Sequence, residues 1–221
     1  MGRELVDLFG RVHRDFRISV TDRCNFRCQY CMPEEGLDWL KREELLTFEE
    51  ITRLTKILVE NYGIHSVRLT GGEPTLRANL SDLISMLSEL PIEIALTTNG
   101  INLEKNAHLL RSAGLNRVNI SIDSLQAEKF KEITHRDEMQ KVITGIEASL
   151  EAGLLPVKIN VVAMRGINDD EILDFAKFGR DRSVIVRFIE FMPLDADEKW
   201  STSAVLSQEE IFSTINSVYP L

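Results

Sequence analysis

The stretch EIALTTNGINLEKNAHLLRSAGLNRVNISID, residues 93–123, decides the fold class of this chain. Its two ends, residues 93–98 and 117–123, are rich in aliphatic and β-branched residues, which favour β-strands. The intervening residues 103–113 favour a helix, and Gly114 follows at the position where a helix end turns left-handed. The stretch is therefore predicted to form a strand, a helix and a second strand.

The same alternation runs through the rest of the chain in both directions. Strands are predicted at Arg17–Thr21, Ser66–Thr70, Glu93–Thr98, Arg117–Asp123, Val157–Met164 and Val184–Phe191. Helices are predicted at 48–61, 79–89, 103–113, 137–152, 169–181 and 208–217. Each strand is mostly apolar on both faces, which is typical of parallel strands that are covered on both sides.

Six successive strand–helix units without a polar linker predict a single domain over residues 1–221. Right-handed crossovers leave two architectures, a doubly wound sheet and a curved barrel. Six units fall short of the eight that close a full TIM barrel. The predicted fold class is therefore α/β, and a barrel would be a partial one.

Three of the predicted helices begin at a capping box, in which Ser, Thr or Asn is followed three residues later by Glu. The pairs are Thr47 with Glu50, Asn168 with Glu171, and Ser207 with Glu210. The helix after Thr47 is expected to bury one apolar face, formed by Phe48, Ile51, Leu54, Ile57 and Leu58.

The composition is that of an ordinary globular protein of 221 residues, of which 43% are hydrophobic. Its 26 Lys and Arg against 35 Asp and Glu give a net charge of −9, which excludes a bulk basic surface for nucleic acid or an anionic membrane. No apolar run reaches the ~18 residues that a membrane-spanning helix needs. The N-terminus carries Arg3, Glu4 and Asp7 and no apolar signal-peptide core, so we expect a cytoplasmic protein.

All three cysteines lie in one short loop, Cys24-Asn-Phe-Arg-Cys28-Gln-Tyr-Cys31, directly after the first predicted strand. A clustered, odd set of thiols is a poor disulfide framework and a better metal site. Three thiolates can hold an iron–sulfur cluster that leaves one iron open to another ligand. Zinc would need a fourth ligand such as His13 or His65, and inert core thiols are the remaining alternative.

Two further loops follow predicted strands and would meet the cysteine loop at the same edge of the sheet. In RLTGGEP, residues 68–74, the two glycines either form a plain turn or let a ligand approach the backbone beside Thr70 and Glu73. The segment TTNG, residues 97–100, has the same two interpretations.

Polar residues inside predicted strands point to a ligand. Asn119, Ser121 and Asp123 alternate and therefore share one strand face. Three cations, Arg17, Lys158 and Arg187, lie in or beside strands, where a charge is costly unless it is paired. They either form internal ion pairs with acidic residues or provide a cationic focus for an anionic ligand such as a polyphosphate.

The cysteine motif, with Tyr30 before its last cysteine, resembles that of the radical S-adenosylmethionine (SAM) superfamily. Further strings along nearly the whole chain resemble the GTP 3′,8-cyclase family of molybdenum cofactor biosynthesis. These strings are Leu5–His13, Arg17–Cys24, Thr70–Pro74, Thr97–Gly100, Val157–Asn160, Met164–Asn168 and Arg187–Pro193. The resemblance implies a partial (β/α)6 TIM-like barrel, the radical SAM core.

In that family, Cys24, Cys28 and Cys31 would hold a [4Fe–4S] cluster whose fourth iron binds SAM. Reduction would cleave SAM to a 5′-deoxyadenosyl radical, so the resemblance assigns no side chain as catalytic. SAM would contact Tyr30, Gly72, Ser121 and Met192. GTP would contact Arg17, Arg68, Thr97 and Lys158. Arg187 receives no role from the resemblance, and we expect it to form an ion pair.

The implied reaction cyclises GTP to (8S)-3′,8-cyclo-7,8-dihydroguanosine 5′-triphosphate. The implied partners are a reductant such as flavodoxin or ferredoxin, the downstream cyclic pyranopterin monophosphate synthase, and a second copy in a homodimer. The family also carries a second [4Fe–4S] cluster on three C-terminal cysteines, but no cysteine follows Cys31 here. We therefore expect a truncated cyclase. The alternatives are a naturally short paralogue acting on another substrate and a catalytically silent iron–sulfur module.

Overall fold

A six-stranded sheet is the frame of the fold, and all of its strands run parallel. The computed structural model describes residues 3–33, 38–193 and 200–220. The strands neighbour one another in chain order: β3 (Asp15–Ser19), β4 (Ser66–Thr70), β5 (Glu93–Thr98), β6 (Arg117–Ser121), β7 (Lys158–Ala163) and β8 (Ile185–Glu190). A doubly wound sheet would reverse its strand order. The predicted α/β fold is thus confirmed as a partial (β/α)6 barrel.

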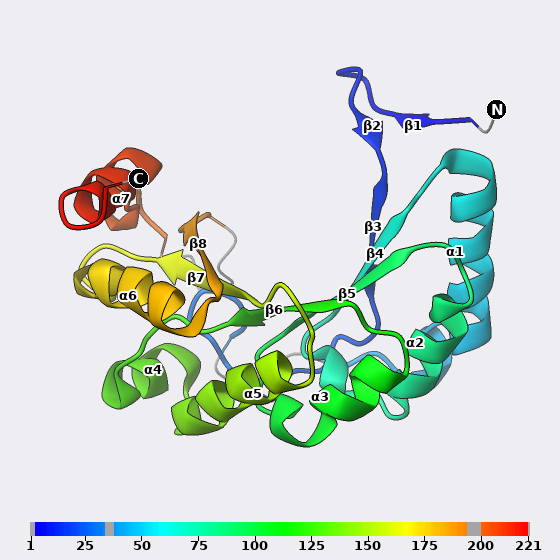
Figure 1. Cartoon of the computed structure of the whole chain (residues 1–221), viewed down its shortest axis with the longest axis horizontal. Helices are drawn as coiled ribbons and strands as arrows, with labels where there is room; N and C mark the ends of the chain where they lie inside the picture. Colours follow the sequence, from blue (N-terminus) through cyan, green and yellow to red (C-terminus); the bar gives the residue numbers. More distant parts are fainter. Residues whose placement is uncertain (1–2, 34–37, 194–199, 221) are drawn as a thin grey trace.

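Helices connect the strands, and α1 to α6 follow the outer side of the curved sheet (Figure 1). The helices are α1 (Phe48–Tyr62), α2 (Leu80–Ser88), α3 (Leu103–Ser112), α4 (Ala127–Thr134), α5 (Met139–Glu151), α6 (Ile172–Arg182) and α7 (Gln208–Asn216). Single 3-10 turns lie at Arg42–Glu44, Pro74–Leu76, Asp169–Glu171 and Thr202–Ala204. The sequence pattern does not predict α4, because this short helix buries only Phe130, Ile133 and Thr134.

The two faces of the sheet differ. The face towards the helices is apolar and nearly fully buried, and includes Val67, Leu69, Ile94, Leu96, Val118, Ile120, Ile159 and Val161. The alternate residues, on the inner face, include Arg17, Arg68, Thr97, Asn119, Lys158 and Arg187. The prediction of two apolar faces is wrong, because α1 to α6 cover the outer face and the inner face of an open barrel can carry polar side chains.

Two of the three predicted capping boxes are confirmed. The hydroxyls of Thr47 and Ser207 each accept a hydrogen bond from the N–H of the glutamate three residues later, and that glutamate accepts in return. The box at Asn168 is wrong. Its amide instead donates to the carbonyl oxygens of Asp123 and Val162, which joins the ends of β6 and β7.

The apolar face of α1 is only partly buried. Ile51 is 3% exposed, but Leu54 and Ile57 are 41% and 43% exposed, which contradicts the expectation for this helix. The reason is position: α1 is the first helix of the outer layer, and α2 packs on one side of it (Figure 1). Gly114, by contrast, has the left-handed φ of 113° that the sequence predicts.

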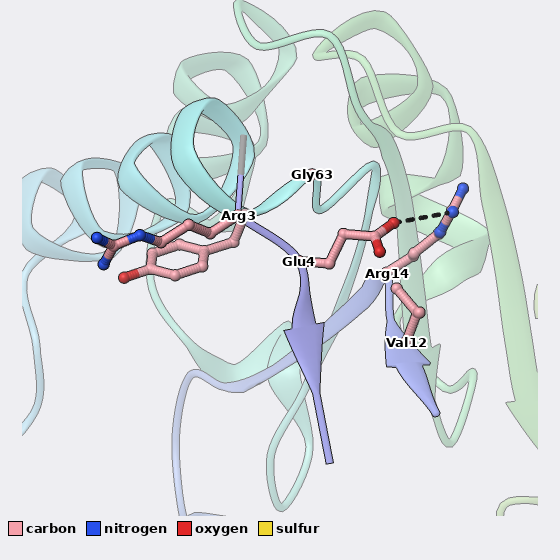
Figure 2. A pocket seen from close by; sticks show the side chains of 6 residues that line it. Arg3, Glu4, Val12, Arg14 and Gly63 are labelled. Atoms are coloured by element: carbon pink, nitrogen blue, oxygen red, sulfur yellow. Dashed lines mark hydrogen bonds and ion pairs between the residues drawn. The ribbon is translucent and has the colours of Figure 1, made fainter. Parts of the chain in front are cut away.

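A small hairpin precedes the sheet and is not predicted by the sequence pattern. Its strands, β1 (Leu5–Val6) and β2 (Val12–His13), pair antiparallel and project from the body of the molecule (Figure 1). A pocket of about 220 Å³ lies between this hairpin and the end of α1, and Arg14 and Glu4 in its lining form an ion pair of 3.4 Å (Figure 2). The hairpin leads into the start of β3, so this pocket lies at the opposite end of that strand from the cysteines.

None of the helices in the described ranges has the length and apolarity needed to cross a membrane.

Candidate functional site

The cysteine loop begins where β3 ends, at the C-terminal edge of the sheet. The Gly71-Gly72 turn after β4 packs directly against the start of this loop, and the N–H of Gly72 donates to the carbonyl of Thr21 at 2.8 Å. A Cβ atom on Gly72 would come within 2.4 Å of the carbonyl oxygens of Asp22 and Arg23. The chain's own backbone therefore requires glycine here, and contact between Gly72 and SAM stays a prediction.

Glu73 joins the loops that follow β4 and β5. Its side chain is buried, and one carboxylate oxygen accepts hydrogen bonds from the hydroxyls of Thr75 and Thr98, both at 2.6 Å. The other oxygen accepts from the N–H of Asn99 at 2.7 Å. Both oxygens are engaged within the chain, which gives Glu73 a structural role at this edge of the sheet.

Helix α4 anchors the first half of the cysteine loop. The N–H of Arg27 donates to the carbonyl of Thr134 at 3.1 Å, and the N–H of Gln29 donates to that of Ile133 at 3.0 Å. Because the sequence pattern does not predict α4, it also gives no sign of this anchor.

Side chains next to Cys24 strengthen the attachment of the loop. Phe26 is 4% exposed and stacks edge-on against Phe130 of α4, with 5.8 Å between the ring centroids. The Asn25 side chain accepts a hydrogen bond from the Asn99 amide at 2.7 Å, and its carbonyl accepts one from Arg136 at 2.7 Å. The loop is thus fixed to β5 on one side and to α4 on the other.

The three thiols lie close enough to influence one another. Burial raises the pKa of Cys24, and the Glu73 carboxylate and Cys31 add to this effect. Burial raises the pKa of Cys28 well above its ordinary value, as do Asp123 and the other two cysteines. Desolvation, followed by Asp123, also raises the pKa of Cys31, the most exposed of the three. A bound cation would offset the burial and the repulsion from nearby negative groups, and would therefore favour the thiolate form of the three cysteines.

The donor set fits an iron–sulfur cluster by its chemistry, since all three donors are thiols on one loop and Cys31 is exposed. In the ranges that the structure describes, no three His, Cys, Asp or Glu side chains are already gathered closely enough to hold a metal ion. His13 and His65, considered as a fourth zinc ligand, precede β3 and β4 and lie at the opposite edge of the sheet. These two histidines therefore cannot complete a zinc site with the cysteine loop.

Asp123, just beyond β6, connects the sheet to the cysteine loop. It is 3% exposed and accepts hydrogen bonds from the Tyr30 hydroxyl at 2.6 Å and from the N–H of Val162 at 2.8 Å. Burial raises its pKa to about 6, although both hydrogen bonds act in the opposite direction. Tyr30, a predicted SAM contact, is thus held at the end of β6.

Ser121 and Met192, two other predicted SAM contacts, lie near the ends of β6 and β8. Ser121 is half-buried at the end of β6, two residues before Asp123. Met192 lies beyond β8 and is 51% exposed. Their contact with SAM, like that of Tyr30 and Gly72, stays a prediction.

Arg17, Arg68, Lys158 and Arg187 are four of the cations on the inner face. Arg17 is opposite Arg68 in the register of β3 and β4, Lys158 is on β7, and Arg187 is on β8. In the described part of the chain, none of the four forms an ion pair. The expectation of an ion pair for Arg187 is therefore wrong, because the register places it beside Asn160 and not beside an acid. The interpretation as a cationic focus is the one that fits these contacts.

Buried polar atoms on the same face lack partners. Four of them have no hydrogen bond within the described ranges: Arg68 Nε, Arg117 Nη1, Asn119 Oδ1 and Asn160 Oδ1. Such groups are normally paired, so these atoms mark positions where a ligand or water would bond. Thr97 meets this group, since its hydroxyl accepts from the Asn119 amide at 3.3 Å.

Burial lowers the pKa of Arg68, and Arg17, Arg117 and Arg187 lower it further, so these guanidinium groups act on one another. Sequence reasoning missed Arg117 and Asn160 as members of this group. The alternation of side chains along a strand could have revealed both. Arg117 is two residues before Asn119 and Asn160 is two residues after Lys158, so each shares a strand face with a residue that the sequence analysis singled out.

A family model described as the radical SAM superfamily matches residues 18–179. A GTP 3′,8-cyclase of Corynebacterium glutamicum is 46% identical over 225 residues, which cover 99% of this chain and 60% of that protein. One of Listeria monocytogenes is 48% identical over 215 residues, covering 96% and 64%. One of Alkaliphilus metalliredigens is 46% identical over 217 residues, covering 97% and 68%.

Solved structures support the fold. The crystal structure of methylornithine synthase has a TM-score of 0.71 at 18% identity, covering 99% of this chain and 63% of that chain. The structure of anSMEcpe with bound AdoMet has a TM-score of 0.72 at 19% identity, covering 92% and 58%. With its three cysteines on one loop at the C-terminal edge of a parallel partial barrel, this chain belongs to the radical SAM superfamily and, within it, to the GTP 3′,8-cyclase family.

Proposed function

We propose that this chain is the radical SAM core of an enzyme that cyclises GTP to (8S)-3′,8-cyclo-7,8-dihydroguanosine 5′-triphosphate, the first step of molybdenum cofactor biosynthesis. The chain spans 60% and 64% of the lengths of its Corynebacterium and Listeria relatives, whose name supplies the substrate class. The proposal assigns a [4Fe–4S] cluster to the cysteine loop, SAM to the adjoining strand ends, and the triphosphate to the inner face.

The observation that carries the proposal is the group of cations without ion-pair partners on the inner face. The chain as a whole is acidic, with a net charge of −9, yet Arg17, Arg68 and Lys158 share this face and form no ion pair among the described residues. A triphosphate offers acceptor oxygens that match these donors. Each charge-assisted hydrogen bond contributes about 1.5–3 kcal/mol, so three of them hold a polyphosphate without any broad basic surface.

The register suggests how a nucleotide would lie. Arg17 and Arg68 are two residues before Ser19 and Thr70, so they lie roughly 7 Å further from the C-terminal edge. Phosphates bound at these arginines would direct the nucleoside towards the cysteine loop. Thr97 would then contact the nucleotide between the arginines and the cysteine loop.

The residues at the C-terminal edge would hold the cofactors. Cys24, Cys28 and Cys31 would provide the thiolates, and SAM would contact Tyr30, Gly72, Ser121 and Met192. When bound, the cluster and SAM supply the radical chemistry, while the protein orients the reactants and excludes water.

We also propose the cellular setting that the family suggests. The chain would act in the cytoplasm as a homodimer, with electrons from a flavodoxin or ferredoxin. Its product would be used by cyclic pyranopterin monophosphate synthase.

Anaerobic reconstitution tests the proposal. The protein should bind about four iron atoms, cleave SAM to 5′-deoxyadenosine on reduction, and bind GTP. Cys28→Ala should lose the iron because the cluster loses a thiolate, whereas Met32→Leu in the same loop should load normally. Zinc in place of iron would contradict the radical SAM assignment. SAM cleavage by a protein that does not bind GTP would contradict the cyclase assignment alone.

A further inference from the structure

The second half of the cysteine loop is attached to the barrel differently from the first. Two backbone hydrogen bonds, donated by the N–H groups of Arg27 and Gln29, hold the first half against α4. The N–H groups of Cys31 and Met32 instead both donate to the carbonyl of Cys28, at 2.9 and 3.1 Å, and so remain inside the loop. Within the described ranges, the hydroxyl of Tyr30 makes the hydrogen bond that links residues 30–33 to the sheet.

Asp123 is a fixed point for that hydroxyl. Its second carboxylate oxygen accepts from the N–H of Val162, and its own carbonyl accepts from the Asn168 amide at 2.7 Å. Asn168 is itself 1% exposed and bonds to the backbone of Val162 and Met164. The carboxylate thus belongs to a buried network that joins β6 to β7.

We infer that Asp123 is a positioning residue, which holds Tyr30 and through it the third cysteine, Cys31, in place against the end of β6. The inference rests on the proposed function of the cysteine loop. A hydroxyl-to-carboxylate bond of 2.6 Å is short and charge-assisted, and such bonds are about twice as strong as neutral ones. Tyr30 directly precedes Cys31, the most exposed of the three thiols, so movement of its ring would move that ligand.

The test uses Tyr30→Phe, which removes the hydroxyl and keeps the ring. The matched control is Tyr62→Phe at the end of α1, at the opposite edge of the sheet. Asp123→Asn is the conservative variant, because its amide can still accept from Val162 and donate to the tyrosine oxygen. The measurements are iron content, the EPR spectrum of the reduced cluster with and without SAM, and the Kd for SAM.

We expect Tyr30→Phe to load iron like the wild type, with an altered EPR spectrum and about tenfold weaker SAM binding. Asp123→Asn should remain close to the wild type, and Tyr62→Phe should match it. The inference is overturned if Tyr30→Phe matches Tyr62→Phe in spectrum and affinity. Loss of iron from Tyr30→Phe but not from Tyr62→Phe would also support the inference, because a displaced Cys31 would hold its iron less well.

Amide hydrogen exchange in the iron-free protein separates this inference from the proposed function. Tyr30→Phe should speed exchange at Cys31 and Met32, but not at Arg27 and Gln29, which are held by α4. If the wild type binds neither iron nor SAM, the proposed function fails. Hydrogen exchange then remains as the test of whether the bond between Tyr30 and Asp123 holds the second half of the loop. Unchanged exchange at Cys31 and Met32 would then overturn the inference.

Discussion

Arg17 lies directly opposite Arg68 in the register of β3 and β4, and both side chains belong to the inner face of the barrel. Like charges in opposed positions destabilise a sheet, and the Nε atom of Arg68 is also buried without a partner in the described part of the chain. An arrangement that is unfavourable in the free protein becomes favourable when an anion supplies the missing charge. Stability and ligand binding should therefore respond in opposite directions when this pair is changed.

Arg68→Met should stabilise the ligand-free protein and weaken nucleotide binding. Removal of a half-buried guanidinium whose Nε atom is buried without a partner in the described ranges should raise the free energy of unfolding by about 1 kcal/mol. Loss of one charge-assisted contact should weaken GTP binding by about tenfold or more. Urea unfolding and calorimetric titration with GTP measure the two effects.

Arg117→Met is the matched control for that prediction. Arg117 is on the same face but donates to the carboxylate of Glu93, so its removal should destabilise the protein. A stability loss in both variants, or unchanged GTP affinity in Arg68→Met, would contradict the view of Arg68 as an anion-binding residue.

Gly72→Ala should displace the start of the cysteine loop. The added methyl group would overlap the carbonyl oxygens of Asp22 and Arg23, so we expect a loss of about 1–3 kcal/mol in stability together with lower iron content. Gly153→Ala is the control: it has a left-handed φ of 72° and no atom near its added Cβ, so it should cost about 1 kcal/mol and leave iron loading intact. Equal iron content in the two variants would count against packing of the Gly71-Gly72 turn on the loop.

Asp123 should make the stability of the iron-free protein depend on pH. Its pKa in the folded state, about 6, lies above its ordinary value of 3.8. The folded state therefore keeps a proton that the unfolded state has released, and stability falls as pH rises through the window between these values. The fall is about 3 kcal/mol at most and ends above the folded-state pKa. Urea unfolding across this pH window should show no such fall in stability for Asp123→Asn. If Asp123→Asn and the wild type have the same pH dependence, the fall is not due to Asp123.

Lys158→Ala should weaken GTP binding about tenfold or more while SAM cleavage is retained. Lys158 is on β7 in register with Asn119 on the inner face, far along the chain from the cysteines. Lys105 is an exposed lysine of α3, and Lys105→Ala tests whether loss of any positive charge weakens GTP binding equally. Equal GTP affinity in Lys158→Ala and Lys105→Ala would remove Lys158 from the binding site.

The sequence predicts the parallel strands well, because local composition determines them. Ser66–Thr70 and Glu93–Thr98 have the predicted bounds, and β6, β7 and β8 differ only at their ends. Alternation shows a polar face at Asn119, Ser121 and Asp123, but local patterns do not show that the neighbouring strands share it, since that depends on which side the helices cover. The same limit applies to Leu54, which has core spacing but lies where nothing in the described outer layer buries it.

The candidate site could be predicted only in part. The cysteine loop is visible in the sequence because metal-binding thiols must cluster. The role of Asn168 is not, since its spacing to Glu171 matches a capping box while its contacts are with residues on β6 and β7. The partners of Asp123 and the missing partners of Asn160 likewise depend on tertiary contacts between distant segments.

The most direct test of the central claim is a calorimetric competition with the reconstituted chain. GTP should bind at least a hundredfold more tightly than guanosine, tripolyphosphate should displace it, and Arg68→Met should reduce the difference. Equal affinities for GTP and guanosine, with no displacement by tripolyphosphate, would contradict the assignment of the inner-face cations to a triphosphate.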